Sequence, residues 1–382
     1  MQDLLKINFP GKLVFGKGTL EQLPDEITAL SCNRLLIVTI SPLLTQLNTL
    51  IAILEARGVK VFVNMSIMRE PTFAEVQQMM QEVSGFNPDV VAGIGGGSVL
   101  DVAKLIAALL DNEQGLKEIT GIGLLKKRSK KLICIPATSG TGSEVSPNSI
   151  LVDEADNQKK GIISPFLVPD IVYIDPLLTM SVPPSITAVT GIDALTHCLE
   201  AYTNLFAHPL IDVYAFEGMR LIAAHIVQAV QNGKDSAART QLAMGSLLGG
   251  FCLGPVNTAG VHALSYPLGS TFHLTHGLSN ALLLPYVMEF NYVAAPKRYA
   301  DVAIALGCDR QADDIKTALK GIEKIRSLIS DCGIPARLRD VGIPKEAISQ
   351  MAVDAMKITR LLKNNPRPIT EADAIEIYNA AY

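Results

Sequence analysis

The chain has 382 residues, of which 48% are hydrophobic and 18% are charged, and its formal net charge at pH 7 is −4. This composition excludes an intrinsically disordered chain, and the length exceeds that of one ordinary core, so we expect two domains. Because the net charge is negative, nucleic acid and acidic membranes are not expected as main partners.

Hydrophobic residues occur in short runs, shorter than the roughly 20 residues of a membrane-spanning helix. The first ten residues lack the basic and then apolar pattern of a secretory signal, so a cytoplasmic location is expected. The cysteines are scattered without a C-x-x-C pair, which argues against a disulfide framework and a cysteine-ligated zinc site. We expect them to be small buried residues: Cys32, Cys134, Cys198, Cys252, Cys308 and Cys332.

The first half of the chain alternates hydrophobic, β-branched segments with segments of helical periodicity. The predicted strands are residues 34–39, 59–64, 89–94 and 131–136, and the predicted helices between them are 41–57, 72–84 and 99–111. Such alternation predicts a doubly wound, Rossmann-like parallel sheet in an α/β domain. Ligands are expected at the carboxyl ends of its strands.

The second half is predicted to be all helical, with helices at 186–203, 209–231, 237–253 and 277–294 and more up to the end of the chain. Pro183 and Pro184 cannot lie inside a helix, so we place the domain boundary there, giving domains 1–183 and 184–382. Residues 261–276 are not expected to form one continuous helix, because they contain Pro267 and Gly269.

A glycine-rich segment follows the predicted strand 89–94 and opens the next helix. Glycines let backbone N–H groups approach an anion at a helix N-terminus, so this segment is a candidate phosphate loop, although it does not fit G-x-G-x-x-G and a tight turn remains an alternative. The candidate cofactor residues here are Gly95, Gly96, Gly97, Ser98 and Asp101.

A second polar loop follows the strand that ends at Pro136. Its hydroxyl side chains, Thr138, Ser139 and Thr141, suit the sugars and the pyrophosphate of a dinucleotide. Helix caps and turns are the alternative role for each of them.

Three of the six histidines fall within residues 261–276, and a fourth, His197, lies four residues after Asp193 on a predicted helix. Side chains four residues apart share one helix face, so Asp193 and His197 can bind one metal, although a simple Asp–His hydrogen bond is at least as common. Adding His262 and His276 completes a set of one oxygen and three nitrogen ligands. This set suits Fe(II), Zn or Ni and does not suit Ca²⁺.

Longer motifs connect these loops and ligands along nearly the whole chain. In order they are PGKLVFGKGTLEQLP, GGGSVLDVAK, PATSGTGSEV, VYIDPLLTMSVPPSITAVTGIDALTHCLEAY, HALSYPLG, FHLTHGLSNALLLP, GIPARLRDVGI and NPRPIT. With them the sequence closely resembles the iron-containing alcohol dehydrogenases (group III, metal-dependent), whose fold is shared with glycerol dehydrogenase and dehydroquinate synthase.

The resemblance implies roles for individual residues. The family's metal ligands fall on Asp193, His197, His262 and His276, with Fe(II) or zinc as the metal. Its cofactor loops fall on the glycine segment and the Thr138–Thr141 loop, and Lys159 matches a lysine that contacts NAD or NADP. His273 matches a histidine beside the nicotinamide, where it either relays a proton or supports the metal ligands.

The chain departs from the family pattern at two positions. Tyr266 stands where many members have a histidine, and a phenol exchanges protons at neutral pH far less readily than an imidazole does. Ile40 stands where many NAD-preferring members have an aspartate after the first strand. We therefore expect tolerance of NADPH, unless Ile40 only packs under the adenine.

These features predict a metal-dependent alcohol dehydrogenase or aldehyde reductase that acts as a homo-oligomer, as a dimer or larger. The metal polarises the substrate oxygen while hydride passes between the substrate and nicotinamide C4. Two alternatives are a metal-dependent lyase or hydrolase on the same scaffold and a nucleotide-binding protein without catalysis. Phe251, Leu264 and Phe272 favour a short aliphatic substrate. His208 and His225 are expected to have structural or surface roles, with His208 at a helix start.

Overall fold

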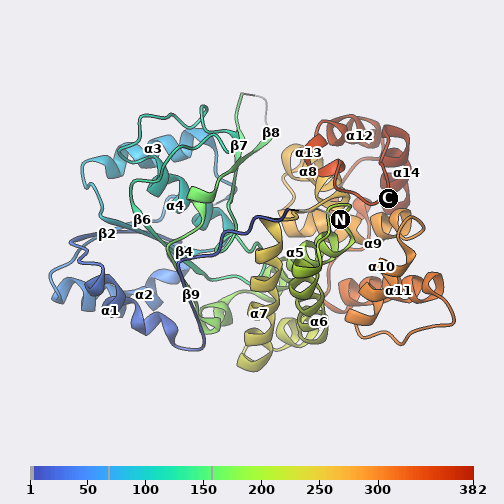
Figure 1. Ribbon diagram of the computed structural model, residues 1–382, viewed down its shortest axis with the longest axis horizontal. Coiled ribbons are helices and arrows are strands. Elements are labelled where there is room, and N and C mark those ends of the chain that lie inside the picture. The colour runs from blue at the N-terminus through green and yellow to red at the C-terminus, as the bar shows by residue number, and fades with distance from the viewer. Residues whose placement is uncertain (1–3, 68, 156–157) are drawn as a thin grey trace. The chain divides into compact units, whose positions relative to one another are not determined.

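A computed structural model of the protein describes residues 4–67, 69–155 and 158–382 (Figure 1). The chain divides into two compact units. The sheet unit contains Asn8–Thr138 and Ser143–Thr179, and the helical unit contains Met180–Tyr382, Ser139–Gly142 and the described residues up to Ile7.

The main sheet of the sheet unit has six strands in the order β1-β9-β6-β4-β2-β3, and all of its pairings are parallel. Its strands are β1 (Lys12–Phe15), β2 (Arg34–Val38), β3 (Lys60–Asn64), β4 (Val90–Gly95), β6 (Lys131–Pro136) and β9 (Ile171–Ile174). The predicted strands are confirmed to within one residue at each end. The parallel pairing of β4 with β6 aligns Gly95 with Pro136, so the two polar loops leave the sheet side by side.

Helices cover both faces of this sheet. The faces are covered by α1 (Leu23–Ala29) and α2 (Leu44–Ala56) on one side and by α3 (Phe73–Ser84) and α4 (Gly97–Leu109) on the other, each with its own buried core (Figure 1). The sequence T-x-x-E starts α3 as a capping box, in which Thr72 and Glu75 each bond the other's backbone N–H. The predicted doubly wound fold is confirmed.

A smaller sheet was not predicted. It has the order β5-β8-β7 and consists of β5 (Gly121–Ile122), β7 (Asn148–Asp153) and β8 (Gln158–Ile163), with β7 and β8 antiparallel. Most of the residues of β8 are only partly buried, and the strand contains two lysines, so it lacks the hydrophobic run that marks the central strands.

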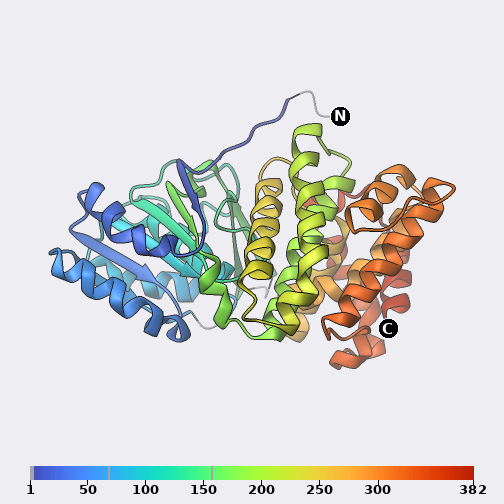
Figure 2. The ribbon, with the colours of Figure 1, turned by 90° about the horizontal axis from the view of Figure 1, so that it is seen from below.

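The helical unit contains no strand among its described residues, as predicted, and its long helices α5, α6 and α7 lie side by side (Figure 2). Its α-helices are α5 (Pro184–Thr203), α6 (Pro209–Gln231), α7 (Ser236–Leu253), α8 (Gly260–Phe272), α9 (His276–Asn291), α10 (Pro296–Ala305), α11 (Asp314–Asp331), α12 (Ile348–Met356), α13 (Thr359–Leu362) and α14 (Glu371–Ala381). Among the described residues, no helix combines the length and the apolar character needed to span a membrane. All six cysteines are free thiols, and all but Cys308 are buried.

Residues 261–276 do not form one continuous helix, as predicted, but the helix is not interrupted at Pro267 or Gly269. Helix α8 runs through both Pro267 and Gly269 and ends at Phe272, because His273 takes a left-handed conformation with φ of 57°. A proline inside a helix costs about 3 kcal/mol. Burial of a leucine-sized side chain contributes about 1.5–3 kcal/mol, so the buried face of α8, which includes Leu264 and Leu268, offsets that cost.

Candidate metal centre and cofactor loops

Three helices bring the four predicted metal ligands together. Helix α5 carries Asp193 and His197 one turn apart, His262 lies in the first turn of α8, and His276 is the first residue of α9. One ligand atom from each side chain lies within 4.8 Å of all the others. Three of the side chains are buried, and His276 is 30% exposed, so this group is reachable from one side.

The geometry and chemistry of this group fit a divalent metal. Asp193 Oδ1 lies 3.7 Å from His197 Nε2, 3.7 Å from His262 Nε2 and 3.6 Å from His276 Nε2. A tetrahedral metal with bonds of about 2.1 Å places its ligands about 3.4 Å apart. The Asp193 oxygen lies at nearly this distance from each of the three imidazole nitrogens, and one oxygen with three nitrogens suits Fe(II) or zinc better than a hard cation such as Ca²⁺.

Glu200 orients one of these ligands, and sequence reasoning missed it. Its Oε2 lies 2.5 Å from His262 Nδ1, and its Oε1 accepts a 2.6 Å hydrogen bond from the Val261 backbone N–H. A carboxylate at Nδ1 keeps the proton on that nitrogen and leaves the Nε2 lone pair free for a metal. Glu200 is seven residues after Asp193, two helical turns along the same face of α5, which is the signal that points to it.

The charges at the centre are strongly coupled. Burial raises the pKa of Asp193, but His197, His276 and His262 outweigh that effect and hold the pKa well below its usual value. Burial lowers the pKa of His262, whereas Glu200 and Asp193 together raise it to about 9. Burial lowers the pKa of His197.

The first cofactor loop lies where β4 passes into α4. A Cβ atom on Gly95 would lie 2.8 Å from Val99, so this close strand-to-helix turn requires glycine. Gly96 is the N-cap residue of α4, no side chain caps that helix end, and Gly97 and Ser98 are partly exposed. The N-terminus of α4 is therefore available to an anion.

The second loop begins at Thr138, beside the first: a Cβ atom on Gly96 would lie 3.7 Å from Thr138 Oγ1. Thr138 and Thr141 are partly exposed. Ser139 Oγ is buried and makes no hydrogen bond to any described residue. A buried hydroxyl without a partner is costly, so Ser139 is suited to bind a ligand group.

Within the helical unit, residues 139–142 pack tightly against the helices. A Cβ atom on Gly140 would lie 2.6 Å from Thr190 Cβ of α5, and one on Gly142 would lie 2.4 Å from Gly250 Cα of α7. His197 Nδ1 is buried without a hydrogen bond of ordinary geometry, although the Gly140 backbone is near enough to raise the pKa of the ring. The loop with the candidate Ser139 and Thr141 thus adjoins a candidate metal ligand.

The side chain of Asp101 forms hydrogen bonds within the protein. Its Oδ1 accepts a 2.5 Å bond from Ser143 Oγ, and its Oδ2 accepts a 2.9 Å bond from the Ile150 N–H. The buried Lys104 donates to Ser143 Oγ at 2.9 Å and to two backbone carbonyls of the segment that leads into β7. These two side chains of α4 hold the chain just beyond the second loop in place, and the predicted contact of Asp101 with the cofactor stays a prediction.

The two remaining candidate cofactor residues of the sheet unit lie in different surroundings. Lys159 Nζ forms a 2.5 Å ion pair with Glu70 Oε1, and its side chain is only 4% exposed. Ile40 follows β2 and Thr39, precedes the short helix η2 (Ser41–Leu43), and packs as a half-buried residue against both cores of the sheet unit. Its side chain offers neither a charge nor a hydrogen bond.

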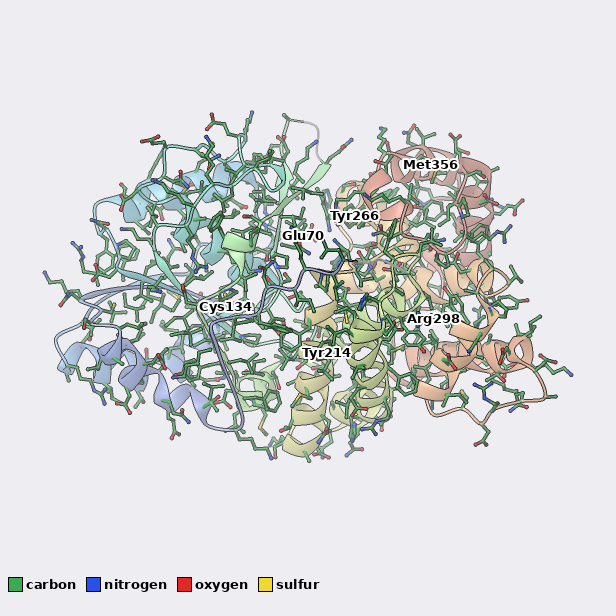
Figure 3. The ribbon with its side chains drawn as sticks, in the orientation of Figure 1. Glu70, Cys134, Tyr214, Tyr266, Arg298 and Met356 are labelled. Atoms are coloured by element: carbon green, nitrogen blue, oxygen red, sulfur yellow. The ribbon has the colours of Figure 1, made fainter. Side chains whose placement is uncertain are left out.

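Tyr266 and His273 differ in their relation to the metal ligands. The Tyr266 ring, labelled in Figure 3, lies edge-on to His276 with centroids 6.3 Å apart. His273 is exposed at the left-handed end of α8 and does not belong to the four-ligand group. Leu264 is completely buried in the helical core, whereas Phe251 and Phe272 are partly buried.

The two histidines expected to have structural or surface roles make local contacts, and the predicted position of His208 at a helix start is confirmed. His208 is the N-cap residue of α6, and its Nδ1 accepts a hydrogen bond from the Leu210 N–H. His225 Nδ1 lies 2.8 Å from the Leu221 carbonyl oxygen one turn earlier on the same helix.

Comparison with known proteins identifies the family. Residues 10–176 match the family described as iron-containing alcohol dehydrogenase, and residues 187–382 match the C-terminal part of the Fe-containing alcohol dehydrogenase family. Together these matches cover nearly the whole chain. The protein therefore belongs to the iron-containing alcohol dehydrogenase family.

Individual relatives match this chain over all or nearly all of their length. Long-chain-alcohol dehydrogenase 1 of Geobacillus thermodenitrificans is 38% identical, with 100% of this chain and 97% of the relative covered. A 1,3-propanediol oxidoreductase structure superposes with a TM-score of 0.95 at 31% identity, with 99% and 100% of the two chains covered. Sulfoacetaldehyde reductase from Bifidobacterium kashiwanohense, solved in complex with NAD⁺, gives a TM-score of 0.89 at 26% identity, with coverage of 100% and 99%.

The protein is thus a metal-dependent oxidoreductase that transfers hydride between a nicotinamide cofactor and a small alcohol or aldehyde, as predicted from the sequence. The names of the relatives give no support to a lyase, a hydrolase or a non-catalytic protein.

Proposed function

We propose that Asp193, His197, His262 and His276 hold one divalent metal, with iron as the native metal and zinc as an alternative. The observation that carries this proposal is the convergence of one oxygen and three nitrogen donors from three helices. When bound, the metal supplies Lewis-acid polarisation of the substrate oxygen. Glu200 fixes the orientation of the His262 ring toward the metal.

In this proposal the two domains predicted from the sequence bind different ligands. Residues 1–183 bind the dinucleotide, and residues 184–382 bind the metal. In this scheme the unpartnered Ser139 hydroxyl and the uncapped N-terminus of α4 bind polar groups of the cofactor. Lys159 contacts the cofactor while Glu70 holds its ammonium group in place.

The substrate end of the site is built from different groups. Tyr266 borders His276, so the position that is a histidine in many family members offers a poor proton donor here. His273 is then the better candidate for a proton relay. The aromatic residues Phe251 and Phe272 favour a short aliphatic aldehyde over a highly charged substrate.

The choice of cofactor and the assembly complete the proposal. NAD is the cofactor that the family supports, and the absence of a carboxylate at Ile40 leads us to propose that NADPH is also accepted. We further propose that the enzyme acts in the cytoplasm as a dimer or larger homo-oligomer.

The test loads the purified protein with Fe(II) or Zn²⁺ and follows NADH and NADPH oxidation with a panel of aldehydes. His262→Ala should remove both the metal and the activity while the fold remains. His225→Ala is the matched control, because its ring lies 2.8 Å from the Leu221 carbonyl oxygen of its own helix and is not part of the four-ligand group. Full metal content and turnover in His262→Ala would overturn the ligand assignment.

A further inference from the structure

Asn280 lies inside the ring of metal ligands. It is completely buried on α9, one helical turn after His276. Its Nδ2 is 2.7 Å from Asp193 Oδ1, 3.1 Å from His262 Nε2 and 3.3 Å from His276 Nε2. One amide nitrogen therefore reaches the ligand atoms of three of the four candidate metal ligands.

The other end of the same amide has no partner. Asn280 Oδ1 is buried and accepts no hydrogen bond from any described residue. A buried carbonyl oxygen without a donor is unfavourable in a packed interior. This amide is therefore satisfied at its nitrogen and unsatisfied at its oxygen.

The packing of α9 on α5 fixes this position. A Cβ atom on Gly277 would lie 2.3 Å from the Val189 carbonyl oxygen of α5 and 3.4 Å from Asp193 Cβ. Only glycine allows the two helices to approach so closely. Because Gly277 and Asn280 are three residues apart, they share a face of α9, and the Asn280 amide is held against Asp193.

A metal ion and an N–H₂ group compete for the same electron pairs. The amide N–H₂ has two hydrogens, so it donates to Asp193 Oδ1 and to one of the two neighbouring imidazole nitrogens, His262 Nε2 or His276 Nε2, when that nitrogen is unprotonated. These lone pairs are ones that a divalent ion needs. A bound cation would repel the amide hydrogens but attract the amide oxygen, which is a normal metal ligand. A half-turn of the amide about its last side-chain bond exchanges the nitrogen and the oxygen.

We propose that Asn280 is a fifth group of the metal site with two alternating roles. Without metal, its N–H₂ group holds the ligands together. With metal, the amide turns and its oxygen approaches the ion, which also gives that oxygen the partner it lacks. This inference rests on the proposed metal function of Asp193 and the three histidines.

The experiment uses Co(II), whose visible spectrum reports coordination, in place of the native metal in the full-length protein. A four-coordinate Co(II) site absorbs much more strongly than a five- or six-coordinate one. Asn280→Leu removes both amide atoms at similar volume, and Asn280→Asp keeps the oxygen and replaces the N–H₂ group with a second oxygen. Asn291→Leu is the matched control, because Asn291 is a buried asparagine of the same helix whose amide pairs with Asn365.

In Asn280→Leu we expect the Co(II) bands to intensify and the affinity for Co(II) to fall about tenfold or more, in line with losses of metal-site partners. Asn280→Asp should bind Co(II) at least as tightly as the wild type but melt at a lower temperature when metal-free. Asn291→Leu should leave the spectrum unchanged. If Asn280→Leu does not fold, the Asp variant alone decides through its metal-free melting temperature and its affinity.

Two failures are distinguishable. Wild-type protein that binds no Co(II) would overturn the proposed metal function itself. Wild-type protein that binds Co(II) with a spectrum and affinity that Asn280→Leu leaves unchanged would overturn the role of Asn280 alone. An Asp variant with weaker Co(II) binding than wild type, or with an unchanged metal-free melting temperature, would also contradict the proposal.

Discussion

The most direct prediction concerns Glu200→Gln, which keeps the shape of the side chain and removes one acceptor. The glutamate accepts hydrogen bonds at both oxygens, from the Val261 N–H and from His262 Nδ1. A glutamine has one oxygen and one N–H₂ group, so it satisfies only one of these donors. When its oxygen takes the Val261 N–H, its N–H₂ group faces His262 Nδ1.

The consequence for His262 is a change of tautomer. With an N–H₂ donor facing Nδ1, the neutral imidazole moves its proton to Nε2, which is the nitrogen required for metal binding. Loss of such a carboxylate partner weakens metal affinity by about 10- to 100-fold. This corresponds to about 1.4–2.7 kcal/mol. If the glutamine takes the other orientation, the buried Val261 N–H loses its acceptor at a cost of about 1–3 kcal/mol in stability.

The assay titrates metal-free wild type and Glu200→Gln with Zn²⁺ in competition with a chelator and measures bound metal by mass spectrometry. Glu217→Gln is the control, since Glu217 is an exposed carboxylate on α6 that pairs with Arg220. It should bind metal as the wild type does. Equal metal affinity and equal stability of wild type and Glu200→Gln would refute the argument from the His262 tautomer.

Three further predictions concern the proton path, the cofactor and the pH dependence of stability. His273→Ala should lower turnover with the best aldehyde and change its pH profile, while metal content stays the same. Ile40→Asp should shift kcat/KM toward NADH by about 10- to 100-fold, because a carboxylate attracts the ribose 2′-OH and repels a 2′-phosphate. Burial raises the pKa of Glu144 from 4.5 to about 7, and the positive charge of Lys104 partly opposes this rise. The Cys134 thiol is another group near Glu144. Between pH 4.5 and 7 the folded protein keeps a proton on Glu144 that the unfolded chain loses, so the free energy of unfolding falls as the pH rises through this range. Glu144→Gln should therefore be more stable than wild type by about 3 kcal/mol above pH 7, with little difference below pH 4.5.

Each of these predictions has a control and a contrary result. For His273, the control is His225→Ala, and unchanged turnover and pH profile in His273→Ala would leave only a supporting role. For Ile40, the control is Ile53→Asp on α2, and a wild-type preference for NADH above about 100-fold would contradict NADPH tolerance. For Glu144, denaturant unfolding of both proteins at pH 5 and pH 8 decides, and parallel pH dependences would refute the effect of burial.

The sequence was sufficient for elements with strong local patterns. The central strands β2, β4 and β6 are hydrophobic runs buried on both faces, and such runs are legible without tertiary information. Strand β8 has no such run, although its antiparallel partner β7 is the preceding strand in the chain. The continuity of α8 through Pro267 depends on the packing of its buried face, which no local propensity contains.

The four residues whose ligand atoms converge could be predicted as candidate metal ligands, because histidine is rare in this chain and because a helix fixes the spacing of Asp193 and His197. Glu200 and Asn280 are different, since glutamate and asparagine on a helix are ordinary surface residues until a partner is known. Glu200 lies two turns after Asp193, and Asn280 lies one turn after His276. These positions point to the metal site only when the three helices are placed together. Long-range packing therefore determines which polar residues surround the metal, while local spacing suggests only the ligands.

The same packing fixes the positions of the side chains at the candidate metal centre. Helix α5 supplies Asp193, His197 and Glu200 at spacings of four and seven residues, so one rigid element sets two ligands and the orientation of a third. Helix α7 presses on that element: a Cβ atom on Gly249 would lie 3.2 Å from the Ala194 carbonyl oxygen and 3.5 Å from His197 Cβ. A side chain at Gly249 would therefore have to displace α5 or α7 by a few tenths of an ångström. Because α5 carries the ligands, such a displacement reaches the metal centre without any change in a ligand itself.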